Sequence, residues 1–238
     1  MIPKFNARRI GEVAIFELQG AFTNPWVNRI KDEMIETMNE EEAKGLLFNV
    51  RETEKVDDPG ALAILQMVRQ APKGGIWGHN LTAYFIAEHM NPQEPIPIFE
   101  KGTEAVGYFG KEFAGRSRNE KRRFPRVKTA LPVELELEDF GDEFLFEGVV
   151  TNLSAGGFYA YFLDAASEEL ARRKLDPYDL KLLKIRLKPD RSRPIETEGK
   201  VLRTGRESSV TQGVAVEFYN LKAADGERIR EFLKEEEK

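Results

Sequence analysis

Two groups of polar residues in the second half of the chain have the types and spacing needed to bind an anionic ligand. One is a cluster of arginines within residues 122–126, and the other is the polar segment 152–157. A guanidinium group donates two parallel hydrogen bonds, so it matches phosphate oxygens or the O6/N7 edge of guanine, and its flat face stacks on bases. The candidate ligand-binding residues are Arg122, Arg123, Arg126, Asn152, Ser154 and Gly157.

The segment 152–157 has the composition of a tight turn between two strands. Asn152 and Ser154 can hydrogen-bond a guanine edge, or they can simply brace the turn, as short polar side chains commonly do. Gly157 is expected to provide a backbone conformation or a close approach that a Cβ would block. Ordinary turn chemistry is the alternative explanation for Asn152 and Ser154.

The arginines belong to a basic segment, residues 116–128, that contains seven Lys or Arg and only Glu120 as an acid. Residues 1–115 hold 12 Lys+Arg and 17 Asp+Glu, and residues 116–238 hold 24 of each, so the net charge of −5 lies in the first half. With an overall pI near 5.4, the chain is a poor candidate for broad nucleic-acid coating. A solvated linker is one interpretation of the segment, and a binding arm for a small anion is the other.

The remaining composition limits the class of protein. The 238 residues contain no cysteine, which excludes disulfides, zinc–thiolate sites and thiol catalysis. No apolar run approaches the ~20 residues of a membrane-spanning helix, and the N-terminus lacks the apolar core of a signal peptide. A cytoplasmic location without membrane insertion is therefore expected.

Strand and helix patterns alternate in the first half. A partly alternating strand is predicted at 12–18, buried strands at 46–50, 81–87 and 96–99, and helices at 25–44, 59–71 and 103–113. Asn24-Pro25 and Asp58-Pro59 each resemble a capping residue followed by Pro at the first helical position. This order predicts an α/β sheet with helices on one face.

Residues 8–112 resemble STAS domains, the family of anti-sigma-factor antagonists, in element order and in one loop. In that family the loop before the second helix often contains a phosphorylatable Ser or Thr, but here the position is Pro59. Asp58 could replace a phosphate by a permanent negative charge, or it could only cap the helix. The resemblance implies that residues 1–115 form a protein-interaction domain.

The second half shows short strands separated by turns. Strands are predicted at 131–137, 144–151, 158–162, 181–188, 199–203 and 213–218, with a helical insertion at 165–175 and an amphipathic closing helix at 225–238. This pattern predicts a small antiparallel β-barrel over residues 116–238.

Residues 116–235 closely resemble PilZ domains, a family of bacterial second-messenger receptors. The hallmark Arg-x-x-x-Arg matches Arg122 and Arg126, and Asp/Asn-x-Ser-x-x-Gly matches Asn152, Ser154 and Gly157. The resemblance implies binding of cyclic di-GMP, usually as an intercalated pair, with no other cofactor. Lys121, just before the first arginine, could attract a phosphate or crowd a second nucleotide.

The resulting hypothesis is a cyclic di-GMP receptor whose arm, residues 116–128, becomes ordered on the ligand and relays this to the STAS-like half or a protein partner. The alternative is a degenerate interaction module that does not bind nucleotide. No catalytic or metal-binding residue is predicted, because His79 and His89 lack ligand spacing with carboxylates and no P-loop, GxSxG or GxGxxG occurs. Specific nucleic-acid binding is not expected.

Overall fold

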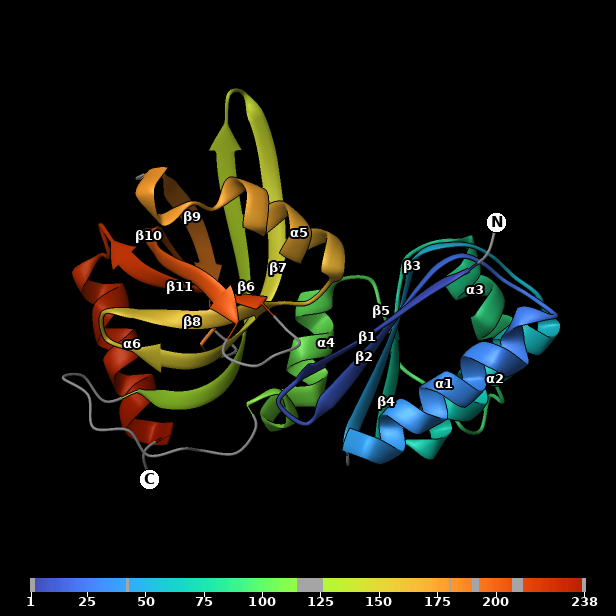
Figure 1. Cartoon of the computed structure of the whole chain (residues 1–238). Coiled ribbons are helices and arrows are strands. Elements are labelled where there is room, and N and C mark those ends of the chain that lie inside the picture. Colours follow the sequence, from blue (N-terminus) through green and yellow to red (C-terminus); the bar gives the residue numbers. More distant parts are fainter. Residues whose placement is uncertain are drawn as a thin grey trace. The chain divides into compact units, whose positions relative to one another are not determined.

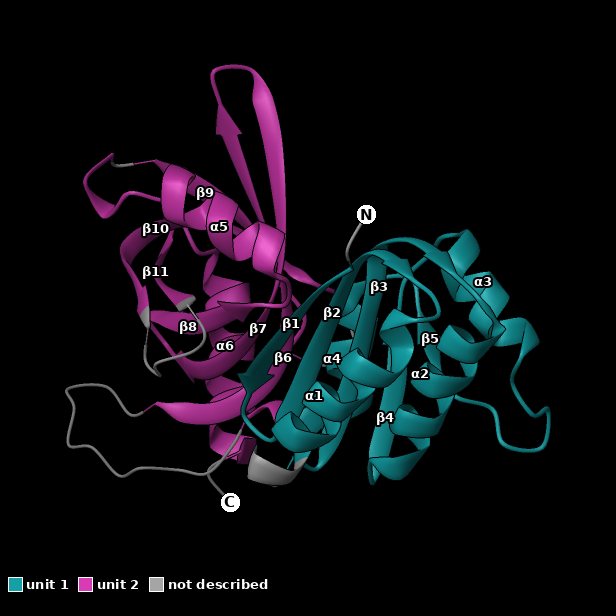
Figure 2. Cartoon of the chain, turned by 45° about the vertical axis from the view of Figure 1, so that its right-hand side comes forward, with its two compact units in different colours: residues 1–112 teal, residues 113–238 magenta. Residues whose placement is uncertain are grey.

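The computed structural model describes residues 3–41, 43–114, 126–179, 181–189, 193–206 and 212–236. The chain divides into two compact units, residues 1–112 and 113–238 (Figure 2). A boundary after residue 115, as the charge distribution suggests, stays a prediction. Among the described residues, no helix combines the length and the apolar character required to cross a membrane.

The first unit is built on a five-stranded sheet in the order β1-β2-β3-β4-β5 (Figure 1). The first two strands are antiparallel, and the other neighbours are parallel. Along the chain the elements are β1 (Lys4–Ile10), β2 (Val13–Phe22), α1 (Trp26–Glu41), β3 (Gly45–Val56), α2 (Asp58–Gln70), β4 (Lys73–Trp77), α3 (Leu81–Glu88), β5 (Ile98–Phe99), α4 (Gly102–Phe109) and the 3₁₀ turn η1 (Gly110–Phe113).

The main core of this unit lies between one face of the sheet and helices α1, α2 and α3. Phe16 and Phe48 pack edge to face there, and Met34 of α1 and Ile64 of α2 cover them. The short helix α4 lies against the opposite face, where the Phe109 ring occupies the space beside Gly45. The predicted α/β sheet with helices on one face is thus confirmed for its three main helices.

The prediction of a strand at 81–87 is wrong, because this segment is helix α3. The Asn80 side chain accepts a hydrogen bond from the Ala83 backbone N–H at 2.9 Å and so begins the helix. Ala83 and Ile86 are buried, whereas Leu81 is 88% exposed, which is a helical and not an alternating pattern. The apolar composition of the segment concealed this one-sided burial.

The strand in this region is β4, which contains Gly74 and Gly75 and has the composition of a turn. A Cβ on Gly74 would lie 2.3 Å from the Val68 carbonyl oxygen of α2, and one on Gly75 would lie 2.6 Å from the Phe99 ring. Glycine therefore lets the strand pass closely under its neighbours, a requirement that only the packed structure reveals.

Three further features of the first unit differ from the sequence-based expectation. Strand β1 was not predicted; it lies at the edge of the sheet, beside β2, and most of its residues are not fully buried. Asp57, not Asp58, caps α2 by accepting from the Gly60 N–H at 3.0 Å. Helix α1 begins at Trp26, after a cis peptide bond between Asn24 and Pro25, so Pro25 is not its first residue.

The second unit is a closed, antiparallel barrel in the order β10-β11-β8-β7-β6-β9. This confirms the predicted barrel. Its elements are β6 (Val127–Asp139), β7 (Asp142–Ser154), β8 (Gly157–Phe162), α5 (Ala165–Lys174), the 3₁₀ turn η2 (Pro177–Asp179), β9 (Leu182–Leu187), β10 (Ile195–Arg206), β11 (Gln212–Tyr219) and α6 (Ala223–Glu236).

The barrel interior is filled by alternate residues of its strands, such as Val133, Leu135 and Phe146. Helix α6 closes the barrel with the fully buried Ile229 and with Phe232, which packs against the same core, as the amphipathic pattern predicts. The hairpin of β6 and β7 is longer than the other strands and extends beyond the barrel in both views (Figures 1 and 2).

Candidate functional site

The turn between β7 and β8 is held by three residues of the predicted polar segment. Ser154 pairs with Gly157 at the end of the hairpin, and its hydroxyl donates to the Gly157 carbonyl at 3.0 Å. The Phe218 N–H of β11 donates to the Gly156 carbonyl at 3.0 Å and ties the turn to the next strand. Ser154 therefore braces the turn from within the strand, and only Ala155 and Gly156 form its tip.

Gly157 permits a close approach of β8 to β11. A Cβ at this position would lie 2.2 Å from the Val216 carbonyl oxygen and 3.0 Å from the Glu217 Cα. Two backbone atoms cannot move aside as a flexible side chain would, so only glycine fits without a shift of the strand. This is the close approach anticipated from the sequence.

Asn152 follows a bulge in β7. Val150 pairs with Ala160 and Asn152 pairs with Tyr159, so Thr151 is an extra residue against β8. Bulges of this kind redirect side chains and are common beside binding sites. The buried Oγ1 of Thr151 has no hydrogen-bond partner among the described residues.

The arginine group meets this turn through the pairing of β6 with β7. Arg126 is exposed and immediately precedes Val127, which pairs with Leu153. The antiparallel register therefore brings the backbone of Arg126 to the level of Ser154. Arg122 and Arg123 lie outside the described residues.

Two further residues, which sequence reasoning did not select, adjoin the site. The Tyr159 hydroxyl donates to the Gly205 carbonyl at 2.9 Å, and the Arg203 guanidinium lies 5.4 Å from the centre of the Tyr159 ring. Because side chains alternate between the two faces of a strand, Tyr159 lies on the same face of β8 as Gly157, and this pattern could have identified Tyr159 from the sequence. The approach of β10, which contributes Arg203, depends on barrel closure and has no local signal.

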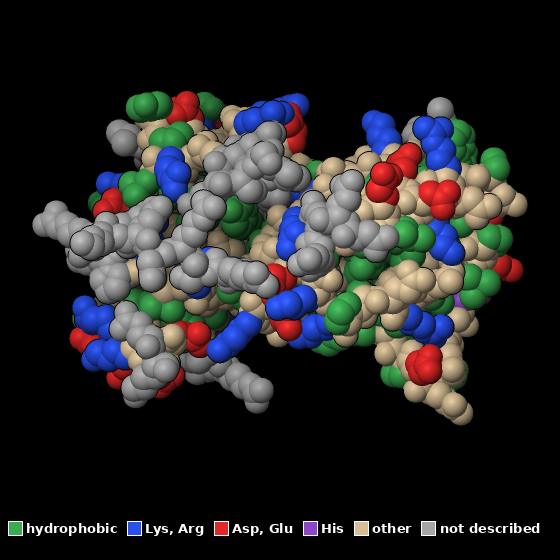
Figure 3. Space-filling view, turned by 60° about the horizontal axis from the view of Figure 1, so that its bottom comes forward, with side chains coloured by type: hydrophobic (Ala, Val, Ile, Leu, Met, Phe, Trp, Pro, Cys, Tyr) green, Lys and Arg blue, Asp and Glu red, His purple; other side chains and the backbone are tan. Residues whose placement is uncertain are grey.

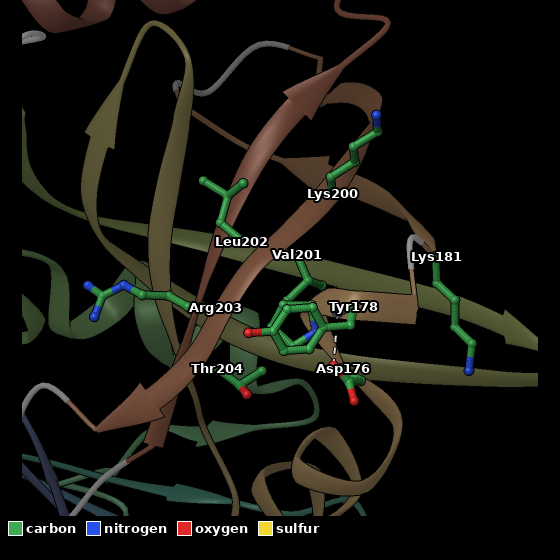
Figure 4. A pocket seen from close by; sticks show the side chains of 9 residues that line it. Asp176, Tyr178, Lys181, Lys200, Val201, Leu202, Arg203 and Thr204 are labelled. Atoms are coloured by element: carbon green, nitrogen blue, oxygen red, sulfur yellow. Dashed lines mark hydrogen bonds between the residues drawn. The ribbon is translucent and has the colours of Figure 1, made fainter.

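A shallow cavity of about 370 Å³ lies between β10 and the segment that contains η2, and Arg203 is one of its lining residues. In Figure 4 the Tyr178 side chain stands over Val201, while Lys181, Lys200 and Arg203 extend in different directions. The backbone N–H of Tyr178 donates to the Asp176 carboxylate at 2.9 Å. Because its cationic groups do not converge, this cavity is a weaker candidate for an anionic ligand than the β7–β8 turn.

Lys or Arg and Asp or Glu side chains are intermixed on the face of the molecule drawn in Figure 3. Figure 3 shows Lys or Arg next to Asp or Glu on the face in view, without one extended patch of a single sign. The resolved pKa shifts belong to ion pairs between strand β6 and lysines at or just before strand β9. Hydrogen bonds from Lys181 and then Lys174 lower the pKa of Asp139. The hydrogen bond between Lys181 and Asp139 raises the pKa of Lys181. The hydrogen bond between Lys184 and Glu136 raises the pKa of Lys184.

Both histidines are held by neighbours in the first unit. His79 Nδ1 lies 3.1 Å from the Tyr84 hydroxyl and 3.2 Å from a Glu100 carboxylate oxygen. His89 Nδ1 lies 2.9 Å from the Phe85 carbonyl, and its Nε2 lies 3.4 Å from Asp58. These contacts are those of local packing and of polar groups near the surface.

A family comparison assigns the second half of the chain: residues 120–235 match the model described as the PilZ domain. Comparison with curated proteins gave no match.

Solved structures resemble each half. The inhibitor of motility MotI/DgrA from Bacillus subtilis is 22% identical over 50% of this chain and 53% of its own, with a TM-score of 0.36, so this chain spans about half the length of that protein. The PilZ domain with c-di-GMP of YcgR from Escherichia coli is 14% identical over 50% of this chain and 92% of its own, with a TM-score of 0.36. An anti-sigma factor antagonist from Mycobacterium paratuberculosis is 7% identical over 44% of this chain and 92% of its own, with a TM-score of 0.40.

The family match covers the whole described barrel, its closing helix and the turn that contains Asn152, Ser154 and Gly157. Residues 120–235 of this chain therefore form a PilZ domain.

Proposed function

We propose that the chain is a receptor for cyclic di-GMP and that its β7–β8 turn, with the arginines before β6, forms the binding site. One observation carries the proposal: the register of β6 with β7 brings the end of the arginine motif to the level of Ser154, in a barrel that matches the PilZ family. The proposed ligand-binding residues are Arg122, Arg123, Arg126, Asn152, Ser154 and Gly157.

The chemistry of the ligand suits these groups. Cyclic di-GMP has two phosphates and two guanines, and both are partners for arginine forks. Tyr159 and Arg203, which lie near the turn, offer an aromatic ring and a further guanidinium for stacking or ion pairing. The proposal includes no catalytic role and no cofactor, since the histidines are engaged in local contacts.

The proposed output is a change at the junction of the two units. Ligand binding would neutralise the basic arm, residues 116–128, and order it across the barrel, which would alter the surface that the N-terminal unit offers to a protein partner. Residues 116–125 of this segment lie outside the described residues. The seven basic side chains of this segment repel one another because they carry the same charge. This repulsion is the physical reason to expect that the segment becomes ordered only when the ligand is bound.

Calorimetric titration of cyclic di-GMP into the full chain tests the receptor function. Hydrogen bonds to charged groups contribute about 1.5–3 kcal/mol each, so Arg122→Ala/Arg126→Ala should weaken binding by well over tenfold. The control is Arg172→Ala/Arg173→Ala on α5, which removes the same charge from a surface ion-pair group with Glu169 and should bind normally.

Absence of heat with the wild-type chain would contradict the proposal and favour a degenerate interaction module. Equal weakening in both double variants would show that net charge, and not the motif, governs binding. The measured stoichiometry also distinguishes one nucleotide from an intercalated pair.

A further inference from the structure

The outer part of the β6–β7 hairpin is a two-stranded arm. Strand β9 pairs with β6 only over Val133–Glu136, and β8 pairs with β7 only from Gly148 onward. Beyond these limits, residues 137–139 pair only with residues 142–144 among the described residues, and Leu145–Glu147 pair with Glu134–Glu136 of β6. We call residues 137–147 the acidic arm. Figures 1 and 2 show this arm projecting beyond the barrel.

The inner face of the acidic arm is fixed to the domain. Asp139 is buried and forms two ion pairs. Its Oδ2 lies 3.0 Å from Lys174 Nζ of α5, and its Oδ1 lies 2.9 Å from Lys181 Nζ. Lys174 also lies 5.0 Å from the centre of the Phe144 ring, and Leu137 is part of the barrel core. The arm is thus held in place, which makes it a preorganised surface.

The outer face concentrates negative charge. Glu138 lies directly opposite Glu143, and at the base of the hairpin Glu134 lies opposite Glu147. Like charges at directly opposed positions destabilise a strand pair. Lys184 compensates Glu136 at 2.5 Å and Arg186 compensates Glu134 at 3.5 Å, but both cations stand at the base.

Exposed apolar side chains accompany this charge. Leu145, on the same outer face, is 62% exposed, and Phe140 at the tip is 100% exposed. Phe140 has φ +53° and Gly141 has φ +91°, so both central residues of the turn adopt the left-handed conformation of a type I′ turn. Asn, Asp or Gly suits the first of these positions, and a phenylalanine there is unfavourable both sterically and by its exposure.

Protection of the strand edges from pairing with another chain would explain the glutamates, because charged side chains keep exposed strands from associating. It does not explain Phe140 and Leu145, which increase the tendency of the same arm to associate. A surface that combines two exposed apolar side chains with an excess of acidic over basic residues, only partly offset by Lys184, instead matches a partner of complementary character.

We propose that the acidic arm docks a partner protein that offers an apolar pocket for Phe140, rimmed by Lys or Arg side chains facing Glu138 and Glu143. The sign of the charge selects a protein, because the phosphates of nucleic acids and anionic lipids would be repelled. The docking surface is separate from the candidate ligand site, since the two lie at opposite ends of β6 and β7.

The partner is sought with a photo-crosslinking residue, p-benzoyl-phenylalanine, in place of Phe140 in the full chain, expressed in the cells that produce it. The matched control carries the same residue in place of Tyr178, which is 90% exposed on η2. We expect one protein to crosslink from position 140 and not from 178, through a peptide that lies among Lys and Arg residues.

Affinity measurements with the purified partner then decide the proposal. Phe140→Asn suits the turn and should leave the domain at least as stable, yet weaken the complex at least about tenfold, as expected for an anchor residue. Glu138→Gln/Glu143→Gln should weaken it severalfold and reduce its salt dependence. Tyr178→Asn should bind normally.

Four results would overturn the docking role of the arm: equal crosslinking from positions 140 and 178, a crosslink only to a second copy of this chain, a crosslink only to nucleic acid or lipid, or a complex unaffected by Phe140→Asn. Each leaves the calorimetric test of cyclic di-GMP binding intact, because the arginine motif is not altered.

Discussion

At the scale of single residues, the β7–β8 turn separates side chains that hold the fold from side chains that can contact a ligand. Ser154 and Gly157 are engaged internally, by a hydrogen bond across the turn and by the close approach to β11. Asn152 is half-buried and forms no side-chain hydrogen bond with the described residues. Ser154 and Gly157 therefore have a structural reason to be present that is independent of any ligand.

Alanine at Gly157 should destabilise the domain by about 1–3 kcal/mol, because its Cβ would overlap the Val216 carbonyl oxygen. Alanine at the adjacent Gly156 is the matched control, since apart from its chain neighbours no atom of the described residues lies within 4 Å of its Cβ position. The unfolding midpoints in urea measure the difference. Equal midpoints for the two variants would contradict the close approach of β8 and β11.

Asn152→Ala should leave the urea midpoint within about 0.5 kcal/mol of the wild type, as expected for a side chain without internal partners. It should nevertheless weaken cyclic di-GMP binding about fivefold, the value of one ordinary hydrogen bond. Calorimetry and urea unfolding on the same preparation test both parts. A variant that binds normally would remove Asn152 from the proposed site.

At the scale of secondary-structure elements, β6 and β7 connect the two surfaces of interest. The candidate ligand site lies at the Val127 end of β6, and the acidic arm lies at the Asp139 end. Over 13 residues of extended chain the two ends are about 40 Å apart. The same hairpin therefore presents two chemically opposite surfaces, one basic and one acidic.

The ion pairs of Asp139 make the attachment of the acidic arm dependent on pH. Lys181 and Lys174 lower the pKa of Asp139, so its stabilising contribution is present above the usual Asp pKa of about 3.9 and is lost as the pH falls through the lower folded value. Asp139→Asn should therefore melt at a lower temperature than the wild type at pH 7, and the difference should shrink below about pH 4. A constant difference between pH 7 and pH 3 would contradict this assignment.

At the scale of the whole molecule, the boundary between the two compact units lies after residue 112, a few residues before the basic segment 116–128 in the sequence. Residues 1–115 contain the entire net charge of −5, and the PilZ domain follows with equal numbers of acidic and basic residues. A ligand that neutralises the basic segment would change the electrostatic balance at this junction more than elsewhere. The relay that we propose depends on this position.

Limited proteolysis with trypsin tests the relay. Saturating cyclic di-GMP should slow cleavage at Arg116 and Arg118 severalfold, because an ordered segment is a poorer protease substrate. Arg122→Ala/Arg126→Ala retains both of these cleavage sites, and in this variant the ligand should not protect them. Equal cleavage rates of the wild type with and without ligand would contradict the ordering of the arm.

Much of the fold followed from local patterns in the sequence. Strict alternation in 131–137 predicts a strand, and the polar segment 152–157 predicts the turn between two others, because a pleated strand has a period of two and turns favour Gly, Asn and Ser. The same locality made the ligand motif visible, since Arg126 and Asn152 each belong to a short, recognisable group. The family match confirms that these groups lie in a PilZ domain.

Only the tertiary structure decided which apolar segments are strands and which side chains meet. Residues 81–88 form a helix and Lys73–Trp77 a strand, because the burial of Ile86 and the tight passage beside Gly74 are set by neighbours distant in the sequence. Barrel closure likewise brings Arg203 to Tyr159, and the projection of the hairpin leaves Phe140 exposed. A local pattern encodes the period and the turns of a segment, whereas its burial and its partners arise from contacts between residues far apart in the chain.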